Sequence, residues 1–515
     1  MRPLIQPIHS LHTPESLVEQ LRGERGIVLL RSGFFESPQA RYSFVAAQPF
    51  LTFRSFGSRC EISSPDQEAR IQPHVQFGNP WHLLDSLMAR YESLEEIDSP
   101  FPLGGCFGYW GYDLKNFVEP KLPRNAVNDL ELPDCCVGFY SSLVVFDHRL
   151  DKTWIISTGL EEDGSRTEAK ARVQLTFWED MLAENKVLPS STRQTMVEPD
   201  AIASPAFCPE NLGSTFTRAE FISKVERAQR YIRAGDIYQV NLSQRLVWSS
   251  SSSRSEPPEG GTPNNPSISG WEFFQRLSSV SPAPFSAYLD CGDFQIASSS
   301  PESFLQMSGS QIRTRPIKGT RPRSPDSNRD AQLTYELQTS AKEMAELVMI
   351  TDLLRNDLGK VCEYGSVQVP ELVRLERYPQ VQHLVSTVEG RLRKDVTHFA
   401  AFASSFPGGS ITGAPKIRAM EIIDELEPVT RGPYTGALGY LGFNRESQLS
   451  ITIRTAVCTK DKIYFNVGAG IVADSDAEAE YEETLAKASG FLAALEQSQT
   501  DATKNQLARG FRTLL

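Results

Sequence analysis

The chain has 515 residues, 40% of them hydrophobic and 23% charged, with a formal net charge of −12 at pH 7. This composition excludes general disorder, and the negative balance argues against a broad surface that binds nucleic acid. No apolar run is long enough to cross a bilayer, and the N-terminal residues lack the apolar core of a signal peptide, so we expect a cytoplasmic protein. Eight cysteines without CxxC spacing predict reduced thiols rather than disulfides or zinc sites.

The first part of the chain, residues 1–187, is predicted to be rich in β-strands. Short runs of apolar, β-branched and aromatic residues alternate there with turn-forming residues. The runs are GIVLLRS at 26–32, YSFVAA at 42–47, SLVVFD at 142–147 and TWIIST at 153–158. Residues 188–213, rich in Pro, Ser and Thr, are typical of a linker. We expect the regions on both sides of this linker to share one core.

The second part, residues 214–497, is predicted to mix helices with strands. Thr217-x-x-Glu220 forms a capping box before apolar residues at helical spacing, which predicts the start of a helix. Residues 249–266 are low in complexity and predict a flexible insertion. The remaining predicted elements are antiparallel strands in the runs 437–443, 449–459 and 462–472, a helix over 476–497 and a C-terminal tail at 498–515.

Two predicted helices carry paired glutamates about one turn apart. Glu480 and Glu483 share a face with Lys487 on the last helix, and Glu343 and Glu346 repeat the spacing on an earlier one. A single helical glutamate is usually solvated, but the repetition of the pair favours a functional interpretation. Two ExxE faces brought together would form an oxygen-rich cage suited to Mg²⁺.

Three other segments could meet an anionic ligand. Arg454 is predicted to lie on a strand, opposite the neighbouring isoleucines, where it would face either solvent or a cavity. Gly468-Ala469-Gly470, at the end of the next strand, would let a ligand approach the backbone. The Gly-rich segment 408–416 precedes an apolar helical run, so its amides and the Thr412 hydroxyl could bind an anion, although such helix entries more often hold no ligand.

Lys318 stands in the segment 313–323, which also contains four arginines. Such crowding disfavours a further ammonium and would supply a neutral, nucleophilic amine; a plain basic surface loop is the alternative. Glu302, in Ser-Pro-Glu-Ser, would suit a general acid if it is desolvated, and otherwise is a turn carboxylate.

Gly104-x-Cys106-x-Gly108 fits the nucleophile elbow of class I glutaminases. A glutaminase also needs a histidine base with an acidic partner, normally in an H-x-E element, and none of the seven histidines has a glutamate two residues on. We interpret the segment as a packed β-turn and expect no glutaminase activity from this chain.

Many separate motifs resemble those of chorismate-utilising enzymes, in the same order along the chain. The resemblance spans Phe216 to Ala494, and the N-terminal region, with LLRS, ARYSFVAA and GGCFGYWGYDL, resembles the component I subfamily less tightly. It implies an α+β fold, with a large antiparallel core of two packed sheets flanked by helices and the active site in the cleft between the sheets. The motifs are GDIYQVNLSQR, SPAPFSAYL, SSPESF, PIKGT, AELVMITDLLRNDLG, QHLVS around His383, GGSITGAPK, IRT around Arg454, GAG and EETLAKA.

Within this family, the motif PIKGT distinguishes two branches. Anthranilate synthase component I usually has Ala where this chain has Lys318, whereas the lysine form is similar to aminodeoxychorismate synthase; Asn241 points the same way. That branch uses chorismate and ammonia to make 4-amino-4-deoxychorismate, on the route to 4-aminobenzoate and folate. It implies a separate glutamine amidotransferase subunit, component II, as the partner, with no nucleic acid and no membrane.

The resemblance also implies a role for each residue named above. Mg²⁺ would be held chiefly by Glu346 and Glu483, with Glu343 and Glu480 completing the acidic surround. Lys318 would be the nucleophile and Glu302 the acid that protonates the leaving hydroxyl. The residues implied to bind substrate are His383, which would also contribute charge, Thr412, Tyr434, Arg454, Gly468, Ala469, Gly470 and Lys487.

One position departs from the family pattern. Related component I chains often bind tryptophan with an acidic residue in an LLES-like segment, where this chain has Arg31. Ser32, Pro284 and Phe285 could still line a remnant tryptophan pocket. The alternatives are anthranilate synthase component I, an isochorismate or salicylate synthase that uses water, and a catalytically silent small-molecule-binding paralogue; the presence of Lys318 and both ExxE pairs counts against the last.

Overall fold

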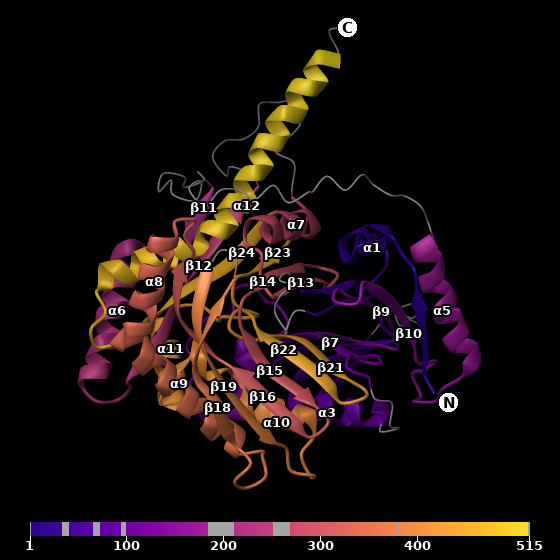
Figure 1. The fold of residues 1–515 in the computed structure, drawn as a ribbon, viewed down its shortest axis with the longest axis horizontal. Helices are drawn as coiled ribbons and strands as arrows, with labels where there is room; N and C mark the ends of the chain where they lie inside the picture. The colour runs from indigo at the N-terminus through magenta and orange to yellow at the C-terminus, as the bar shows by residue number, and fades with distance from the viewer. Residues whose placement is uncertain are drawn as a thin grey trace.

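The computed structural model describes residues 2–32, 41–64, 73–93, 99–183, 211–250, 268–378 and 381–512. Most of the predicted linker and of the insertion expected at 249–266 lies outside these residues. Two antiparallel sheets of twelve strands each dominate the fold (Figure 1). Helices flank both sheets, as expected for the α+β class.

The first sheet combines strands from both halves of the chain. Its order is β1 (Leu4–Ile8), β10 (Lys152–Ser157), β9 (Ser142–Asp147), β3 (Tyr42–Ala46), β2 (Val28–Arg31), β13 (Phe285–Asp290), β14 (Gln295–Ser300), β23 (Thr455–Cys458), β24 (Lys462–Ile471), β12 (Gln239–Ser249) and β11 (Leu212–Ser214), with β20 (Gly413–Ala414) also paired with β12.

The second sheet is built in the same way. Its order is β17 (Ile317–Pro322), β19 (Val381–Arg391), β16 (Gln311–Arg315), β15 (Ser303–Ser308), β22 (Glu446–Ile451), β21 (Ala437–Gly442), β7 (Gly105–Trp110), β8 (Cys135–Tyr140), β4 (Leu51–Phe56), β5 (Arg59–Ser63) and β6 (His74–Phe77), with β18 (Gln368–Arg377) also paired with β19.

The helices follow the predicted signals where these were clear. Thr217 caps its helix reciprocally with Glu220, as predicted. The final helix does not end at 497 but runs to Arg512, because no proline interrupts this stretch. The helices are α1 (Pro14–Gln20), α3 (Pro80–Tyr91), α4 (Lys115–Val118), α5 (Glu168–Ala183), α6 (Arg218–Arg233), α7 (Gly270–Val280), α8 (Ser327–Thr339), α9 (Ala341–Gly359), α10 (His398–Ser405), α11 (Lys416–Leu426) and α12 (Ala477–Arg512), with 3-10 turns η1 (Tyr112–Leu114) and η3 (Gly409–Ile411).

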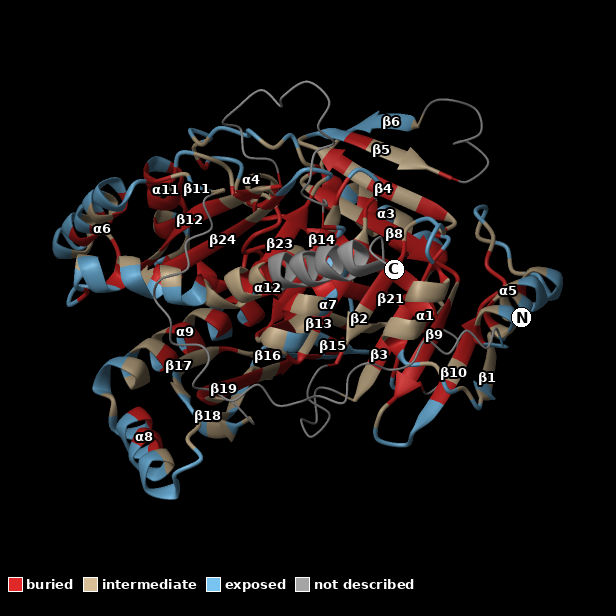
Figure 2. Ribbon diagram, turned by 90° about the horizontal axis from the view of Figure 1, so that it is seen from above, coloured by how far each residue is buried: buried red, intermediate tan, exposed pale blue. Residues whose placement is uncertain are grey.

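Three large apolar layers hold the sheets and helices together, and a smaller one packs α6 and α11 on β12 and β24. The middle layer lies between the sheets, where the Phe44 ring of β3 packs edge-to-face on Tyr440 of β21 with centroids 5.2 Å apart. A second layer packs α3, α9 and α10 on the second sheet, and a third packs α1, α5, α7 and α12 on the first. Buried residues therefore concentrate on the strands, while α6 and α8 are largely exposed (Figure 2). Within the described ranges, no helix combines the length and apolarity needed to span a membrane.

The glutaminase-like segment lies in a strand, so its interpretation as a β-turn is wrong. Gly105, Cys106 and Gly108 belong to β7, between β21 and β8. A Cβ on Gly108 would lie 2.2 Å from the carbonyl oxygen of Cys136, so the glycine permits close strand approach. Cys106 is fully buried, and burial raises the pKa of its thiol well above the usual range, which disfavours the thiolate that a nucleophile needs.

Candidate active site

Glu302 and Arg454 lie on two neighbouring connections, or crossings, at which the chain passes from one sheet to the other. One crossing joins β14 to β15 and the other joins β22 to β23. They lie side by side, because the Ser300 hydroxyl donates to the carbonyl of Ile451 at 2.6 Å and the Ile451 amide donates to the carbonyl of Glu302 at 3.0 Å. Residues far apart in sequence are thus held together where the two sheets meet.

The expectation that Arg454 lies on a continuous strand is wrong. Strand β22 ends at Ile451, and Arg454 has a left-handed φ of 49°. The chain must turn from the second sheet into the first within residues 452–454, which forces this uncommon conformation. As a residue Arg454 is exposed to solvent, yet the surrounding protein desolvates its guanidinium enough to lower the pKa. Arg454 can therefore meet a ligand that enters from solvent.

Glu302 is a desolvated carboxyl group. Its residue is 7% exposed, and burial raises its pKa against the opposing effects of a Ser410 hydrogen bond and the charge of Lys318. The direction of this shift favours the protonated form, which a general acid requires.

Lys318 lies on β17 and faces α9. Its Nζ is 3.8 Å from Oε2 of Glu346, and both side chains are largely buried, with exposed fractions of 16% and 14%. The charge of Lys318 also acts on Glu302, as noted above. The amine, the buried acid and one of the predicted metal-binding glutamates therefore share one site.

His383 completes this side of the site from the neighbouring strand β19. Its Nδ1 lies 2.8 Å from the hydroxyl of Thr320. Burial lowers the pKa of His383 to about 4, and the charge of Arg454 acts in the same direction. The imidazole is therefore neutral near pH 7, which contradicts the expectation that it contributes charge.

The expected crowd of free cations around Lys318 is absent from the described structure. Each of the four arginines forms an ion pair with a carboxylate, which neutralises its field. The pairs and their N–O distances are Arg313–Glu389 at 3.2 Å, Arg315–Glu376 at 2.5 Å, Arg321–Glu343 at 3.3 Å and Arg323–Asp330 at 2.9 Å. The repulsion among free cations on which the sequence argument for a neutral amine depends is therefore not found in the described structure, because all four carboxylates lie outside the segment 313–323.

The other side of the site is formed by the end of β24. Strand β12 pairs along one edge of this strand up to Ile471, but β23 pairs along the other edge only as far as Phe465. Among the described strands, nothing pairs with that second edge at Gly468-Ala469-Gly470. Lys487 uses the open edge, because its Nζ donates to the carbonyl of Gly468 at 2.8 Å and lies 2.7 Å from Glu483.

Gly468 allows a tyrosine to approach the backbone. A Cβ at Gly468 would lie 2.9 Å from the Tyr434 hydroxyl and 3.0 Å from Oδ1 of Asn241. A Cβ at Gly470 would lie 2.5 Å from the amide nitrogen of Gln239, which itself reaches within 3.5 Å of Glu346. Gln239, which the sequence analysis did not single out, thus links the two sides of the site.

Thr412 is placed differently from the expectation. Its side chain is fully buried, and its hydroxyl lies 3.1 Å from the carbonyl oxygen of Gly408 within its own loop. Its carbonyl accepts the amide of Asn241 at 2.8 Å. In this structure Thr412 supports the wall of the site rather than presenting its hydroxyl to a ligand.

The four predicted metal-binding glutamates each have a partner within the protein. Glu346 faces Lys318, Glu483 pairs with Lys487, Glu343 pairs with Arg321, and Glu480 accepts the hydroxyl of Ser475 at 2.6 Å. Burial and the charge of Glu483 raise the pKa of Glu480, while Lys342 of α9 acts in the opposite direction, so the two helices approach here. Within the described residues, no three His, Cys, Asp or Glu side chains converge as a metal site. The donor chemistry suits Mg²⁺, but the ligands are not assembled.

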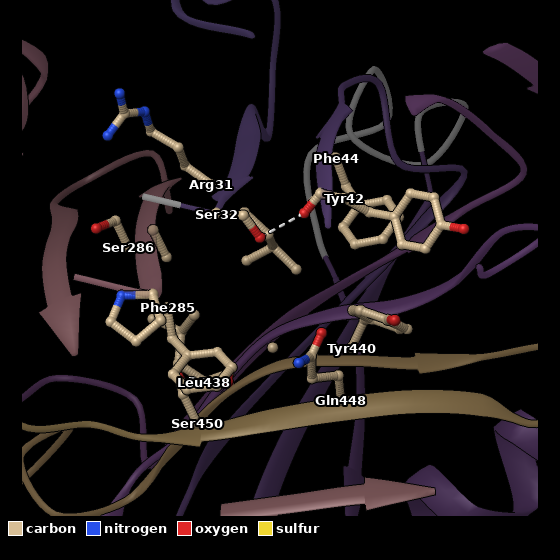
Figure 3. A pocket seen from close by; sticks show the side chains of 14 residues that line it. Arg31, Ser32, Tyr42, Phe44, Phe285, Ser286, Leu438, Tyr440, Gln448 and Ser450 are labelled. Carbon is tan, nitrogen blue, oxygen red and sulfur yellow. Dashed lines mark hydrogen bonds between the residues drawn. The ribbon is translucent and has the colours of Figure 1, made fainter. Parts of the chain in front are cut away.

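The residues named for a remnant tryptophan pocket lie at a recess between the sheets (Figure 3). Ser32, Pro284 and Phe285 line it, together with Tyr440 and other residues of β21 and β22. The Ser32 hydroxyl donates to the carbonyl of Tyr42 at 2.7 Å. The guanidinium of Arg31 points away from the recess and pairs with Glu15.

Comparisons with known proteins find relatives over most of the chain. A family model for chorismate binding enzymes matches residues 32–493. Aminodeoxychorismate synthase component 1 of Escherichia coli (strain K12) is 37% identical over 472 residues, which cover 91% of this chain and 93% of that protein. Anthranilate synthase component 1 of Acetivibrio thermocellus is 36% identical over 492 residues, which cover 95% of this chain and 94% of that protein.

Solved structures show the same architecture. Anthranilate synthase component I from Streptococcus pneumoniae TIGR4 superposes with a TM-score of 0.70 at 29% identity, over 89% of this chain and 93% of that one. The menaquinone-specific isochorismate synthase from Escherichia coli shares the fold with a TM-score of 0.65 at 18% identity, over 96% and 94%. Relatives with two different component names match this chain at nearly equal sequence identity, and the family model spans most of the sequence. This chain therefore belongs to the family of chorismate binding enzymes.

Proposed function

We propose that the chain is the chorismate-binding component of aminodeoxychorismate synthase, which converts chorismate and ammonia to 4-amino-4-deoxychorismate and water. The observation that carries this proposal is the placement of Lys318, an amine where anthranilate synthases usually have alanine, beside Glu346 and the buried acid Glu302. A lysine in that position can act as a nucleophile on the substrate.

The proposed reaction has two displacements. The Lys318 amine forms a bond to ring C2 while the bond from C4 to its hydroxyl breaks, and Glu302 protonates the departing hydroxyl to give water. Ammonia then forms a bond to C4, the bond between Lys318 and C2 breaks, and the proton lost by ammonia restores the acid. The raised pKa of Glu302 supports its role as proton donor in the first displacement.

The substrate would lie between the two sides of the site. Arg454, Tyr434 and Lys487, together with the open backbone edge at Gly468-Ala469-Gly470, would hold one carboxylate and orient the ring. Neutral His383 would contact the ring. Glu346 and Glu483, with Glu343 and Glu480 around them, would hold Mg²⁺. The bound ion would neutralise the ring carboxylate and relieve repulsion between these acids.

The ammonia would come from glutamine through a separate amidotransferase subunit. Cys106, the residue that resembles a glutaminase nucleophile, is fully buried in β7. The component 1 names of the relatives also support a second subunit.

One observation favours a second function, that of an anthranilate synthase component. Anthranilate synthase components match this chain as well as aminodeoxychorismate synthases do. Product identity separates the two. Purified chain incubated with chorismate, Mg²⁺ and ammonium should form 4-amino-4-deoxychorismate, identified by mass spectrometry and by its conversion to 4-aminobenzoate with an added lyase. Anthranilate as the main product would refute the proposal, and no product at all would favour a silent binding protein.

A further inference from the structure

A buried ion pair lies behind the wall formed by Tyr434 and Asn241. The side chains of Arg431 and Glu427 are 1% and 4% exposed. Nε and Nη2 of Arg431 donate to the two carboxylate oxygens of Glu427 at 2.8 and 2.7 Å. Glu427 also accepts the amide and hydroxyl of Ser243 at 2.8 and 2.9 Å, which ties the pair to β12.

The remaining donors of Arg431 reach three separate segments. They donate to the carbonyls of Asn241 at 2.7 Å and Ile411 at 3.2 Å, and to the Thr435 hydroxyl at 3.2 Å. With the two bonds to Glu427, five acceptors match the five N–H groups of a guanidinium. Arg431 therefore has no donor left for a substrate, and its effect must pass through the groups that it holds.

The three segments held by Arg431 are those that build the substrate wall. Asn241 and Tyr434 both approach Gly468, and Ile411 precedes Thr412 in the Gly-rich loop. The guanidinium also lies 5.7 Å from the centroid of the Tyr434 ring. Burial raises the pKa of Tyr434, so its hydroxyl stays protonated and can donate a hydrogen bond.

We propose that Arg431, held by Glu427, is a positioning residue that sets the place of Tyr434, Asn241 and the Ile411–Thr412 loop for chorismate binding. This inference rests on the proposed use of chorismate but not on which product is formed. Lysine cannot replace Arg431, because an ammonium has three donors without the planar fork that reaches all five acceptors.

Two variants test the positioning role in the full-length chain. Arg431→Lys and Glu427→Gln should each raise the KM for chorismate by about tenfold to a hundredfold, with a smaller change in kcat. Hydrogen exchange should accelerate in peptides covering 238–244 and 408–415, because the Asn241 amide bonds to Thr412 across this network. A purely structural role would lower the Tm without moving KM.

Asp147→Asn provides the matched control. It breaks another carboxylate–arginine pair, in which Arg41 bonds both oxygens of the buried Asp147 at 3.1 and 2.7 Å, far along the first sheet. This variant should lose stability but keep the KM for chorismate. If folded Arg431→Lys and Glu427→Gln keep the wild-type KM, the proposal is overturned.

A milder variant keeps the test decisive if both substitutions prevent folding. Thr435→Val removes one acceptor of Arg431 and also the hydrogen bond that the Thr435 hydroxyl donates to the Tyr434 carbonyl, and it should raise the KM about threefold or more. An unchanged KM in Thr435→Val would then overturn the proposal. The readout is independent of the proposed function, since KM for chorismate is measurable from substrate consumption whether the product is aminodeoxychorismate or anthranilate.

Discussion

The two ion pairs of the site, Lys318–Glu346 and Arg431–Glu427, are built in opposite ways. The first joins its partners at 3.8 Å, with exposed fractions of 16% and 14%. The second is bidentate, with a closest contact of 2.7 Å and exposed fractions of 1% and 4%. A loose pair can exchange its partners for substrate or metal, whereas breaking a buried, fully bonded pair leaves an uncompensated charge. We therefore assign the reaction to the Lys318–Glu346 pair and the positioning of the substrate-binding residues to the Arg431–Glu427 pair.

Removal of the Lys318 amine, which belongs to the looser pair, should have the largest effect on activity. Lys318→Ala should lose aminodeoxychorismate formation by about three orders of magnitude or more, because no other nucleophile stands in its place. Chorismate consumption and product identity, measured by chromatography, check this. Lys318→Arg should not rescue the reaction, since guanidinium stays protonated. A wild-type rate in Lys318→Ala would leave Lys318 only an electrostatic role.

Glu302→Gln should come next, because an amide cannot donate the proton that the leaving hydroxyl requires. We expect a loss in kcat of about a hundredfold to ten-thousandfold. In the wild type, kcat should fall as pH rises through the raised pKa of Glu302, and this limb of the profile should vanish in the variant. A pH profile of kcat in both proteins tests this, and an unchanged limb would assign the acid elsewhere.

The same carboxyl predicts a stability difference with a definite sign. Burial raises the pKa of Glu302 above its unfolded value, so the folded state keeps the proton longer. Ionisation of Glu302 therefore costs wild-type stability as pH rises from the unfolded pKa, about 4.3, to the folded one. The Tm of Glu302→Gln relative to wild type should increase across that window, and a constant difference would contradict the shift.

Glu346→Gln and Glu483→Gln should weaken Mg²⁺-dependent chorismate binding and reduce turnover about a hundredfold, because a neutral amide binds a hard dication poorly. Calorimetric titration with Mg²⁺ gives a readout apart from activity. Glu389→Gln, which alters the pairing of Arg313 between β16 and β19 of the second sheet, is the control and should behave as wild type. Near-normal activity of either test variant at low Mg²⁺ would show that the ExxE faces do not build the site.

The smallest effect is expected at Cys106. Cys106→Ser should change neither activity with free ammonia nor the dependence of glutamine use on a second subunit, because the thiol is buried in β7. Assays with ammonium and with glutamine, with and without an added amidotransferase, separate the two sources. Selective loss of glutamine use by the single chain would restore the glutaminase interpretation.

Much of this fold could be predicted from local patterns in the sequence, but features that depend on contacts between distant segments could not. The capping box at Thr217 and the strand runs of the N-terminal part depend on neighbours in sequence, and both are confirmed. The break between β22 and β23 depends on where the two sheets meet, which alternation along 449–459 does not reveal. For this reason Arg454 was expected on a strand rather than on a crossing.

The site shows the same division. The family resemblance brought Glu302, Lys318 and His383 into one hypothesis, and the structure places the Lys318 charge near Glu302 and His383 on the strand next to that of Lys318. The carboxylates that neutralise the arginines near Lys318 lie elsewhere in the chain. The residues around Lys318 in the sequence therefore did not predict the electrostatic field at its amine. Arg431 was missed because two of its four partner residues, Asn241 and Ile411, belong to distant segments, although its spacing of four residues from Glu427 in the sequence was a visible signal.

The order in which the strands occur along the chain has a consequence for biosynthesis. Strands β21 and β22 are interior strands of the second sheet, and β23 and β24 are interior strands of the first. A nascent chain that stops before Ala437 therefore lacks the strands that join the two parts of each sheet. Neither sheet can close until most of the polypeptide has left the ribosome, which makes the incomplete chain a natural client for chaperones.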